Sequence, residues 1–342
     1  MTPQKILALA LMLAAAGAAA AQTATPIPVN TDNFVRAESD VYMGNIVADG
    51  GFGKFEHARN FPALDKQLII RLNRDTLYSY AVVDLDASPA TLVMPNAGTR
   101  YMAAQIVNQD HITVGLWHDP GRHVLTREEA GTRYALIIIR TLVDETSAAD
   151  MKRAHQLQDA LAIEQANTGR FEIPAWDKTS HDQVRKLLLG LVARIPDYKR
   201  MFGSREQIEP VRHLLGTAAG WGGNPESEAI YAGGAVANND GKAVYRVHVQ
   251  DVPMKAFWSL SVYNADGYFE PNPLKRYSVN SVTAHRQADG SIDVQFGGCA
   301  PTTPNCIPTM AGWNYLVRIY RPEASVLDGR WTFPVPVAVA TP

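Results

Sequence analysis

The chain has 342 residues, a length that fits two domains or one large composite domain. Its 32 Lys and Arg residues nearly balance 34 Asp and Glu residues, which gives a formal net charge of −2. No basic cluster occurs beyond the first 21 residues, so the charge pattern argues against nucleic acid or an acidic membrane surface as a partner.

The first 21 residues have the pattern of a secretory signal peptide. Lys5 supplies a positive start, residues 6–20 are apolar, and small residues precede Gln22. We expect cleavage after Ala21 and export to the periplasm. The apolar stretch is shorter than the roughly 20 residues that cross a bilayer, and no later segment approaches that length. We therefore expect no stable membrane insertion.

The next part of the chain predicts one helix followed by short strands. Residues 31–47 carry apolar side chains at helical spacing, with Thr31 or Asp32 as the N-cap, and the glycine-rich residues 49–53 end the helix. Short apolar runs then alternate with turn residues, as in an antiparallel meander or sandwich. These runs are residues 68–72, 78–83, 91–94, 101–107, 112–116 and 134–139.

Two helices are predicted next, one beginning near Ser147 or Asp150 and one at Ser180, and both carry apolar stripes typical of core faces. Strands separated by hairpin signals follow at residues 243–249, 257–262, 292–296, 315–319 and 331–333. We therefore predict a mainly β fold of the mixed α+β class. Its parts are an N-terminal β-rich domain (22–145), a helical connecting segment (146–216) and a C-terminal β-sandwich domain (217–342).

Cys299 and Cys306 lie in a proline-rich loop and are the two cysteines of the chain. In an oxidising compartment this spacing favours a local disulfide. A metal site with two thiolates is the alternative, but no histidine is near in sequence to complete it. We predict no metal site.

Polar side chains follow the strand predicted at residues 68–72. Asp75 there could accept a proton or bind a ligand, and Arg74 could hold an anionic group. The alternative is a hairpin turn in which these side chains bond backbone groups.

Asp110 and His111 follow the strand predicted at residues 101–107 and form the second candidate. A histidine titrates near neutral pH, and a nearby carboxylate tunes it. Neighbours on one strand point to opposite faces, so the two side chains meet only if the chain turns here. We take Asp75, Asp110 and His111 as the catalytic candidates. His118 and His123 match no usual zinc motif, and we interpret them as part of a solvated turn.

A glycine-rich segment with aromatic, amide and acidic residues is the third candidate. An aromatic ring, an amide and carboxylates suit a sugar or another polar, ring-bearing ligand, and two carboxylates could act as acid and base. The alternative is that the glycines allow a close crossing of two domains while the tryptophan anchors their junction. The residues are Trp221, Asn224, Glu226, Glu228 and Tyr231.

Several ordered motifs resemble a known pair of domains. Residues 220–225 (GWGGNP), 257–269 (FWSLSVYNADGYF) and 318–331 resemble the domain of unknown function 1214, and residues 73–79 (NRDTLYS) and 131–134 (GTRY) resemble its N-terminal companion, the domain of unknown function 1254. The resemblance implies two intertwined β-rich domains, at least one a jelly-roll-like sandwich, with helices at their junction. This chain departs from the longer members of the family, because they carry more sequence in the N-terminal domain than it does.

Two functions are open. Similar sequences are sometimes labelled carboxylesterases, so one hypothesis is a hydrolase acting on a small or amphiphilic substrate at the domain junction, although no Gly-x-Ser-x-Gly elbow occurs. The other is a protein that binds a glycan, lipid or protein without chemistry, on a jelly-roll surface. No phosphate loop, dinucleotide fingerprint or haem motif is present, so we predict no cofactor. A homo-oligomer is compatible with either function.

Overall fold

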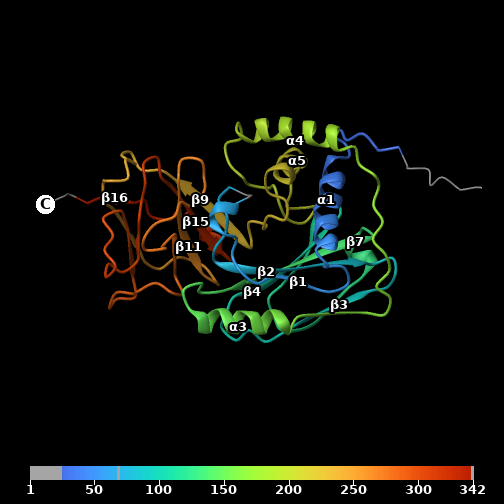
Figure 1. Ribbon diagram of the computed structural model, residues 1–342, viewed down its shortest axis with the longest axis horizontal. Helices are drawn as coiled ribbons and strands as arrows, with labels where there is room; N and C mark the ends of the chain where they lie inside the picture. Colours follow the sequence, from blue (N-terminus) through green and yellow to red (C-terminus); the bar gives the residue numbers. More distant parts are fainter. Residues whose placement is uncertain (1–24, 68–69, 340–342) are drawn as a thin grey trace, which may run out of the picture.

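The computed structural model describes residues 25–67 and 70–339, and Figure 1 shows their arrangement. The strands form four sheets, in which most neighbouring strands are antiparallel. The predicted α+β class is confirmed. The predicted signal peptide, residues 1–21, lies outside the described residues. Among the residues that are described, no helix is both long and apolar enough to cross a membrane.

The N-terminal half is organised around one five-stranded antiparallel sheet. Its strands, in spatial order, are β1 (Glu56–Ala58), β2 (Thr76–Asp84), β7 (Tyr134–Leu142), β4 (Met102–Asn108) and β5 (Thr113–Trp117). Successive residues of a strand point to opposite faces, and every residue of β4 and β7 is buried. Both faces of the sheet are therefore covered.

One face packs against a three-stranded sheet and a helix. The elements are β6 (Gly121–Leu125), β3 (Ala90–Met94), β8 (Ala162–Gln165) and α3 (Ala148–Asp159). Val83 and Ile137 of the large sheet share a core with Leu92 and Leu125 of the small one. α3 lies beside β7, on the side of the sheet away from the other long helices in Figure 1.

Three helices cover the other face: α1 (Phe34–Ala48), α4 (Lys178–Val192) and α5 (Pro210–Gly220). Met43 of α1 packs against Val82 of β2 and Leu136 of β7, and all three are buried. Side-chain caps fix where two of the helices begin, because Asp177 and Glu209 accept backbone N–H groups of α4 and α5.

The C-terminal part is a sandwich of two four-stranded sheets. One has the order β12 (Ser278–Asn280), β11 (Trp258–Tyr263), β15 (Asn314–Tyr320), β9 (Ala229–Gly234); the other has the order β14 (Cys306–Ile307), β13 (Ile292–Phe296), β10 (Tyr245–Val249), β16 (Val337–Ala338). Leu260 and Val317 of the first share one core with Val247 and Val294 of the second. These sheets do not establish a jelly-roll strand order. The short helices are η1 (Leu64–Lys66), α2 (Arg127–Ala130) and α6 (Ala324–Leu327).

Two of the predicted strands are wrong. The described part of the run at 68–72 includes a turn, in which Arg71 has a φ of 54° and donates its N–H to the Gly267 carbonyl. Residues 331–333 form no strand either, since Trp331 and Phe333 instead pack against the sandwich core. An apolar run can be buried against a sheet without joining it, and periodicity does not distinguish the two cases. The predicted helical segment 146–216 contains α3 and α4 together with β8, and its end at 216 falls inside α5. The proposed domain boundaries stay a prediction.

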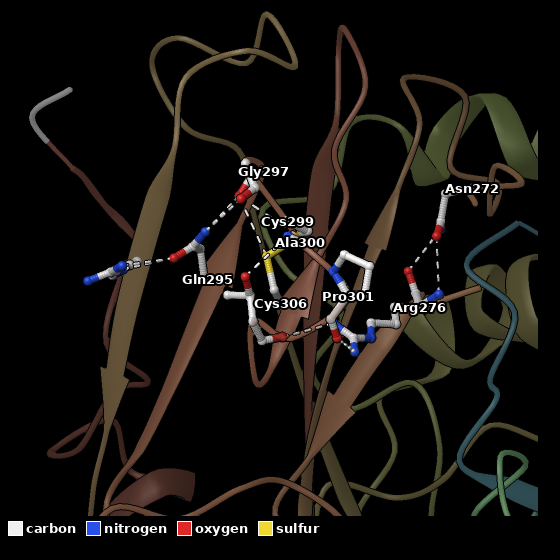
Figure 2. Close-up of a disulfide and its surroundings, with 11 residues drawn as sticks. Asn272, Arg276, Gln295, Gly297, Cys299, Ala300, Pro301 and Cys306 are labelled. Carbon is white, nitrogen blue, oxygen red and sulfur yellow. Dashed lines mark hydrogen bonds between the residues drawn. A yellow bond between two sulfur atoms is a disulfide. The ribbon is translucent and has the colours of Figure 1, made fainter. Parts of the chain in front are cut away.

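The predicted disulfide between Cys299 and Cys306 is present and closes a loop with a sequence separation of 7 (Figure 2). Arg276 fixes this loop from outside, because its guanidinium donates to the carbonyls of Thr303 and Pro301, each at 2.8 Å. Asn272 in turn accepts the Arg276 N–H at 3.2 Å. The disulfide therefore closes the loop after β13, and Arg276 joins that loop to the loop that precedes β12.

Replacing both cysteines by serine (Cys299→Ser with Cys306→Ser) should lower the free energy of unfolding by about 2 kcal/mol, because the unfolded chain regains the entropy that the small closed loop removes. Urea unfolding followed by circular dichroism measures this. Reducing the wild type should give the same loss, and equal stability of the oxidised and reduced wild type would contradict the prediction.

Candidate functional site

The two halves of the protein meet through aromatic side chains. Tyr101, just before β4, lies 5.3 Å from Phe257 and 5.4 Å from Tyr320 between ring centroids. Phe257 and Tyr320 are themselves stacked at 4.2 Å. All three are buried, and they pack with Ala103 and Leu142 of the large sheet. This cluster, which we call the aromatic wall, packs the sandwich against the end of the large sheet.

A cavity of about 570 Å³ opens beside the aromatic wall. It lies between the start of β4, the loop after β5, the beginning of α3 and loops of the sandwich. Four basic and three acidic side chains line it: Arg100, Arg153, Lys255 and Arg321 against Asp119, Asp144 and Asp150. Asp150 is paired with both Arg100 and Arg153. Lys255 and Arg321 form no ion pair with any described residue, so they are available to an anionic ligand.

His118 lines this cavity and is held by a buried carboxylate. It follows β5 directly, and its Nε2 lies 2.9 Å from Oε2 of Glu228, whose side chain is 4% exposed. The other oxygen of Glu228 accepts the Tyr101 hydroxyl at 2.7 Å. We assign the proton to Nε2, because a carboxylate only accepts. Nδ1 of His118 then carries a free lone pair, and no described residue bonds to it.

This arrangement matches the chemistry of a general base. A carboxylate behind an imidazole fixes its orientation and stabilises the imidazolium that forms when Nδ1 takes a proton. The side chain of His118 is 20% exposed and lines the cavity, so the imidazole is not sealed in the core. The interpretation of His118 as part of a solvated turn missed its buried partner.

Asp75 is buried in the contact between the halves. Its Oδ2 accepts the Ser259 hydroxyl at 2.5 Å, while its Oδ1 has no partner in the described part of the chain. Burial raises the pKa of the Asp75 carboxyl, and the nearby Arg318 opposes that rise. Arg74 pairs with Glu145 and lies 5.0 Å from the ring of Phe61. Neither lines the cavity that holds His118.

Asp110 and His111 lie in a turn, the geometry in which their side chains could meet, but the two side chains have separate partners. Asp110 forms ion pairs with Arg36 and Arg205 near the surface. His111 is 3% exposed; its Nε2 accepts the Gly222 N–H and its Nδ1 bonds the Thr217 hydroxyl, both at 2.8 Å. The structure thus does not join Asp75, Asp110 and His111 into one constellation, and their catalytic roles stay predictions.

The residues predicted around Trp221 are divided. Trp221 stacks against Tyr42 at 4.8 Å and against His111 at 5.1 Å, which favours the anchoring alternative. Glu226 accepts the backbone N–H of Arg200. Asn224, which is 5% exposed, donates to the Tyr231 hydroxyl at 3.2 Å, and Tyr231 is 41% exposed. Asn224 keeps an unused amide oxygen, and one carboxylate oxygen of Glu226 has no partner among the described residues.

No described group of three or more His, Cys, Asp or Glu side chains is placed to hold a metal ion. His111 bonds within the helical layer, His118 bonds Glu228, and His123 stacks on Trp117. The three imidazoles thus serve three different environments.

The protein should become less stable as the pH is lowered, because of His111. Burial, followed by the nearby His213, holds the pKa of His111 well below its ordinary value. The unfolded state therefore binds a proton below about pH 6.5 that the folded state does not, and this single group costs about 1.4 kcal/mol of stability for each further pH unit. Unfolding free energies at pH 7.5, 6.5 and 5.5 measure the slope.

The matched variants are His111→Gln, which should flatten the slope, and His285→Gln, which should leave it unchanged because His285 is exposed. Equal slopes in the wild type and His111→Gln would show that His111 takes up its proton in the folded state.

The family described as Protein of unknown function (DUF1254) matches residues 52–121, and the family described as Protein of unknown function (DUF1214) matches residues 229–324. No curated protein matches the chain.

Two solved structures resemble the fold. The VPA0106 protein from Vibrio parahaemolyticus has 14% identity and a TM-score of 0.67, over 91% of this chain and 98% of that one. An uncharacterized protein from Burkholderia cenocepacia has 14% identity and a TM-score of 0.51, over 90% of this chain and 86% of that one. At such identity the likeness shows the fold alone. The two family matches keep the order predicted from the motifs, with DUF1254 followed by DUF1214, so the predicted pair is confirmed.

Proposed function

We propose that the protein is a periplasmic hydrolase that cleaves a small ester bearing a negative charge, with His118 as its general base. The observation that carries the proposal is the pairing of His118 with the buried Glu228 at the wall of the cavity. Lys255 and Arg321 support a charged substrate, because both line the same cavity without an ion-pair partner among the described residues.

The reaction needs no group beyond water and the substrate. Nδ1 of His118 takes a proton from water while the water oxygen attacks the ester carbonyl carbon. The resulting oxyanion is stabilised by the positive charge of Lys255 and Arg321. When the intermediate collapses, the bond to the alkoxy oxygen breaks and the imidazolium returns its proton to the departing alcohol. Glu228 stays ionised and stabilises the imidazolium, as its hydrogen bond to Tyr101 also favours.

His118→Gln should lower kcat/KM for an ester by about 100-fold, the size of effect expected when a general base is removed. Glu228→Gln keeps the shape of the side chain and should have a smaller effect in the same direction, with a shifted pH profile. Release of nitrophenol from 4-nitrophenyl succinate, which carries a free carboxylate, measures both.

The matched control is His248→Gln. His248 forms the same kind of pair with Asp293, at 2.7 Å, but on an exposed sheet surface. The His248→Gln variant should hydrolyse the ester at the same rate as the wild type. Equal rates for the wild type and His118→Gln, or equal losses in His118→Gln and His248→Gln, would refute the role of His118.

The second candidate function is binding without chemistry, of a glycan, lipid or protein on a jelly-roll-like sandwich. It is favoured by one observation: no described Ser or Thr hydroxyl bonds to His118, so a side-chain nucleophile is not in place. The face-to-face packing of the two C-terminal sheets supports a sandwich surface for such binding. The ester assay separates the two functions, because a pure binding protein has no turnover for His118→Gln to reduce.

A further inference from the structure

A second set of polar groups lies on the same face of the large sheet as the helices. In the antiparallel register Tyr78 of β2 pairs with Arg140 of β7, and Arg140 pairs with Ala103 of β4. Paired residues point to the same face, so these three side chains form one row across the sheet. The next row toward the helices holds Tyr80 and Ile138. Arg140 therefore lies between the helical layer and the aromatic wall.

Arg140 is a buried cation without a buried anion. It is 5% exposed and donates to the side-chain oxygen of Gln105 at 2.7 Å and to the Gly222 carbonyl at 2.8 Å. Within the described chain, no carboxylate lies at ion-pair distance from it. Burying an unpaired charge is costly, because neutral acceptors replace only part of the lost hydration.

Arg318 is the other buried arginine of the described residues, and its surroundings can be compared with those of Arg140. Arg318 is 3% exposed and donates to the Arg71 carbonyl at 2.7 Å and to the Tyr263 hydroxyl at 2.9 Å. The buried carboxyl of Asp75 lies near enough for the charge of Arg318 to lower its pKa. Arg318 thus lies near one buried carboxyl, whereas no carboxylate of the described residues lies at ion-pair distance from Arg140.

Neutral hydrogen-bonding groups surround Arg140. The guanidinium lies 5.4 Å from the ring centroid of Tyr78, whose hydroxyl also accepts from Asn73 at 3.2 Å. Burial raises the pKa of Tyr78, but the charge of Arg140 and the side-chain hydrogen bonds to the hydroxyl together lower it. The ring of Tyr78 thus lies beside the positive charge of Arg140, and its hydroxyl keeps an O–H to donate.

Asn224 lies two residues after Gly222, whose carbonyl accepts from Arg140, and supplies an unused amide oxygen. Its Oδ1 is buried and has no partner within the described residues, while its Nδ2 contacts the Tyr231 hydroxyl. Oxygen and nitrogen of an amide are exchanged by a half-turn of the group. In the turned state the Tyr231 hydroxyl donates to the oxygen, and the NH₂ group occupies the unbonded position as a donor. Tyr231, the partner of this amide, is 41% exposed.

We propose that Arg140, Tyr78 and Asn224 bind the carboxylate of a small, ring-bearing molecule. The planar guanidinium fits a planar carboxylate, and the two neutral donors add hydrogen bonds without cancelling the charge. The rings of Tyr78 and Tyr80 are stacked at 5.7 Å with an interplanar angle of 7°, and both are half-buried, so they offer a flat apolar surface beside the charge. None of these residues lines the cavity that holds His118, so this site is additional to the proposed hydrolase site.

The test is isothermal titration of the whole mature protein with benzoate, benzamide and inorganic phosphate. Benzoate should bind, and benzamide, which has the same ring without the charge, should bind at least about tenfold more weakly. Arg140→Gln should weaken benzoate by at least about tenfold. Arg246→Gln is the matched control; Arg246 bonds Gln295 on the exposed surface, so the net charge changes equally and benzoate affinity should not.

Asn224→Asp is a second variant, whose result does not depend on whether Arg140→Gln folds. It keeps the size of the side chain and places a carboxylate where the ligand would lie, so benzoate affinity should fall by at least about tenfold in a protein with an unchanged circular dichroism spectrum. Equal affinities for benzoate and benzamide, binding of phosphate without benzoate, or wild-type affinity in both variants would overturn the proposal. Benzoate titration of His118→Gln keeps this result separate from ester hydrolysis, since the two sites share no residue.

Discussion

The packing of Phe257 and Tyr320 against Tyr101 is the interaction on which both candidate sites depend. Tyr101 lies in the region that matches DUF1254, and Phe257 and Tyr320 lie in the region that matches DUF1214. The contact brings the turn before β9 to the sheet, so that Glu228 reaches both Tyr101 and His118. Because neither half supplies this carboxylate and this imidazole together, the His118 pair exists only in the joined protein.

The junction also contains buried charge that folding alone does not require. Glu228 and Arg140 are each buried with neutral partners, apart from the imidazole that Glu228 holds. Apolar residues of similar size would avoid the desolvation cost at both positions. Buried charges that lower the stability of a core are expected at functional sites, because the loss of stability is tolerated there for binding or chemistry. This reasoning applies to Glu228 and Arg140, and also to Asp75, whose Oδ1 has no partner among the described residues.

Local signals in the sequence were sufficient for the disulfide, the first helix and most strands, because each depends on neighbouring residues. They were insufficient for the sites. His118 and Glu228 are separated by 110 positions, and no spacing rule connects them. Arg140 follows a continuous apolar run, which predicts a buried strand but not that the strand continues through a charged residue to Leu142. His111 was singled out for its neighbour Asp110, yet a turn with positive φ directs it inward, where burial makes it a neutral structural group.

Ala103 explains why the two sites stay separate although they share one sheet. The register of β4 with β7 places Ala103 beside Arg140, and the pairing of Ala104 with Trp117 brings His118 next to it on the other side. Strands lie about 4.8 Å apart, so side chains on this row would otherwise approach each other closely. The small methyl group of Ala103 instead leaves room for the aromatic wall to reach the sheet. A larger residue there would displace Phe257 and Tyr320, and with them the position of Glu228.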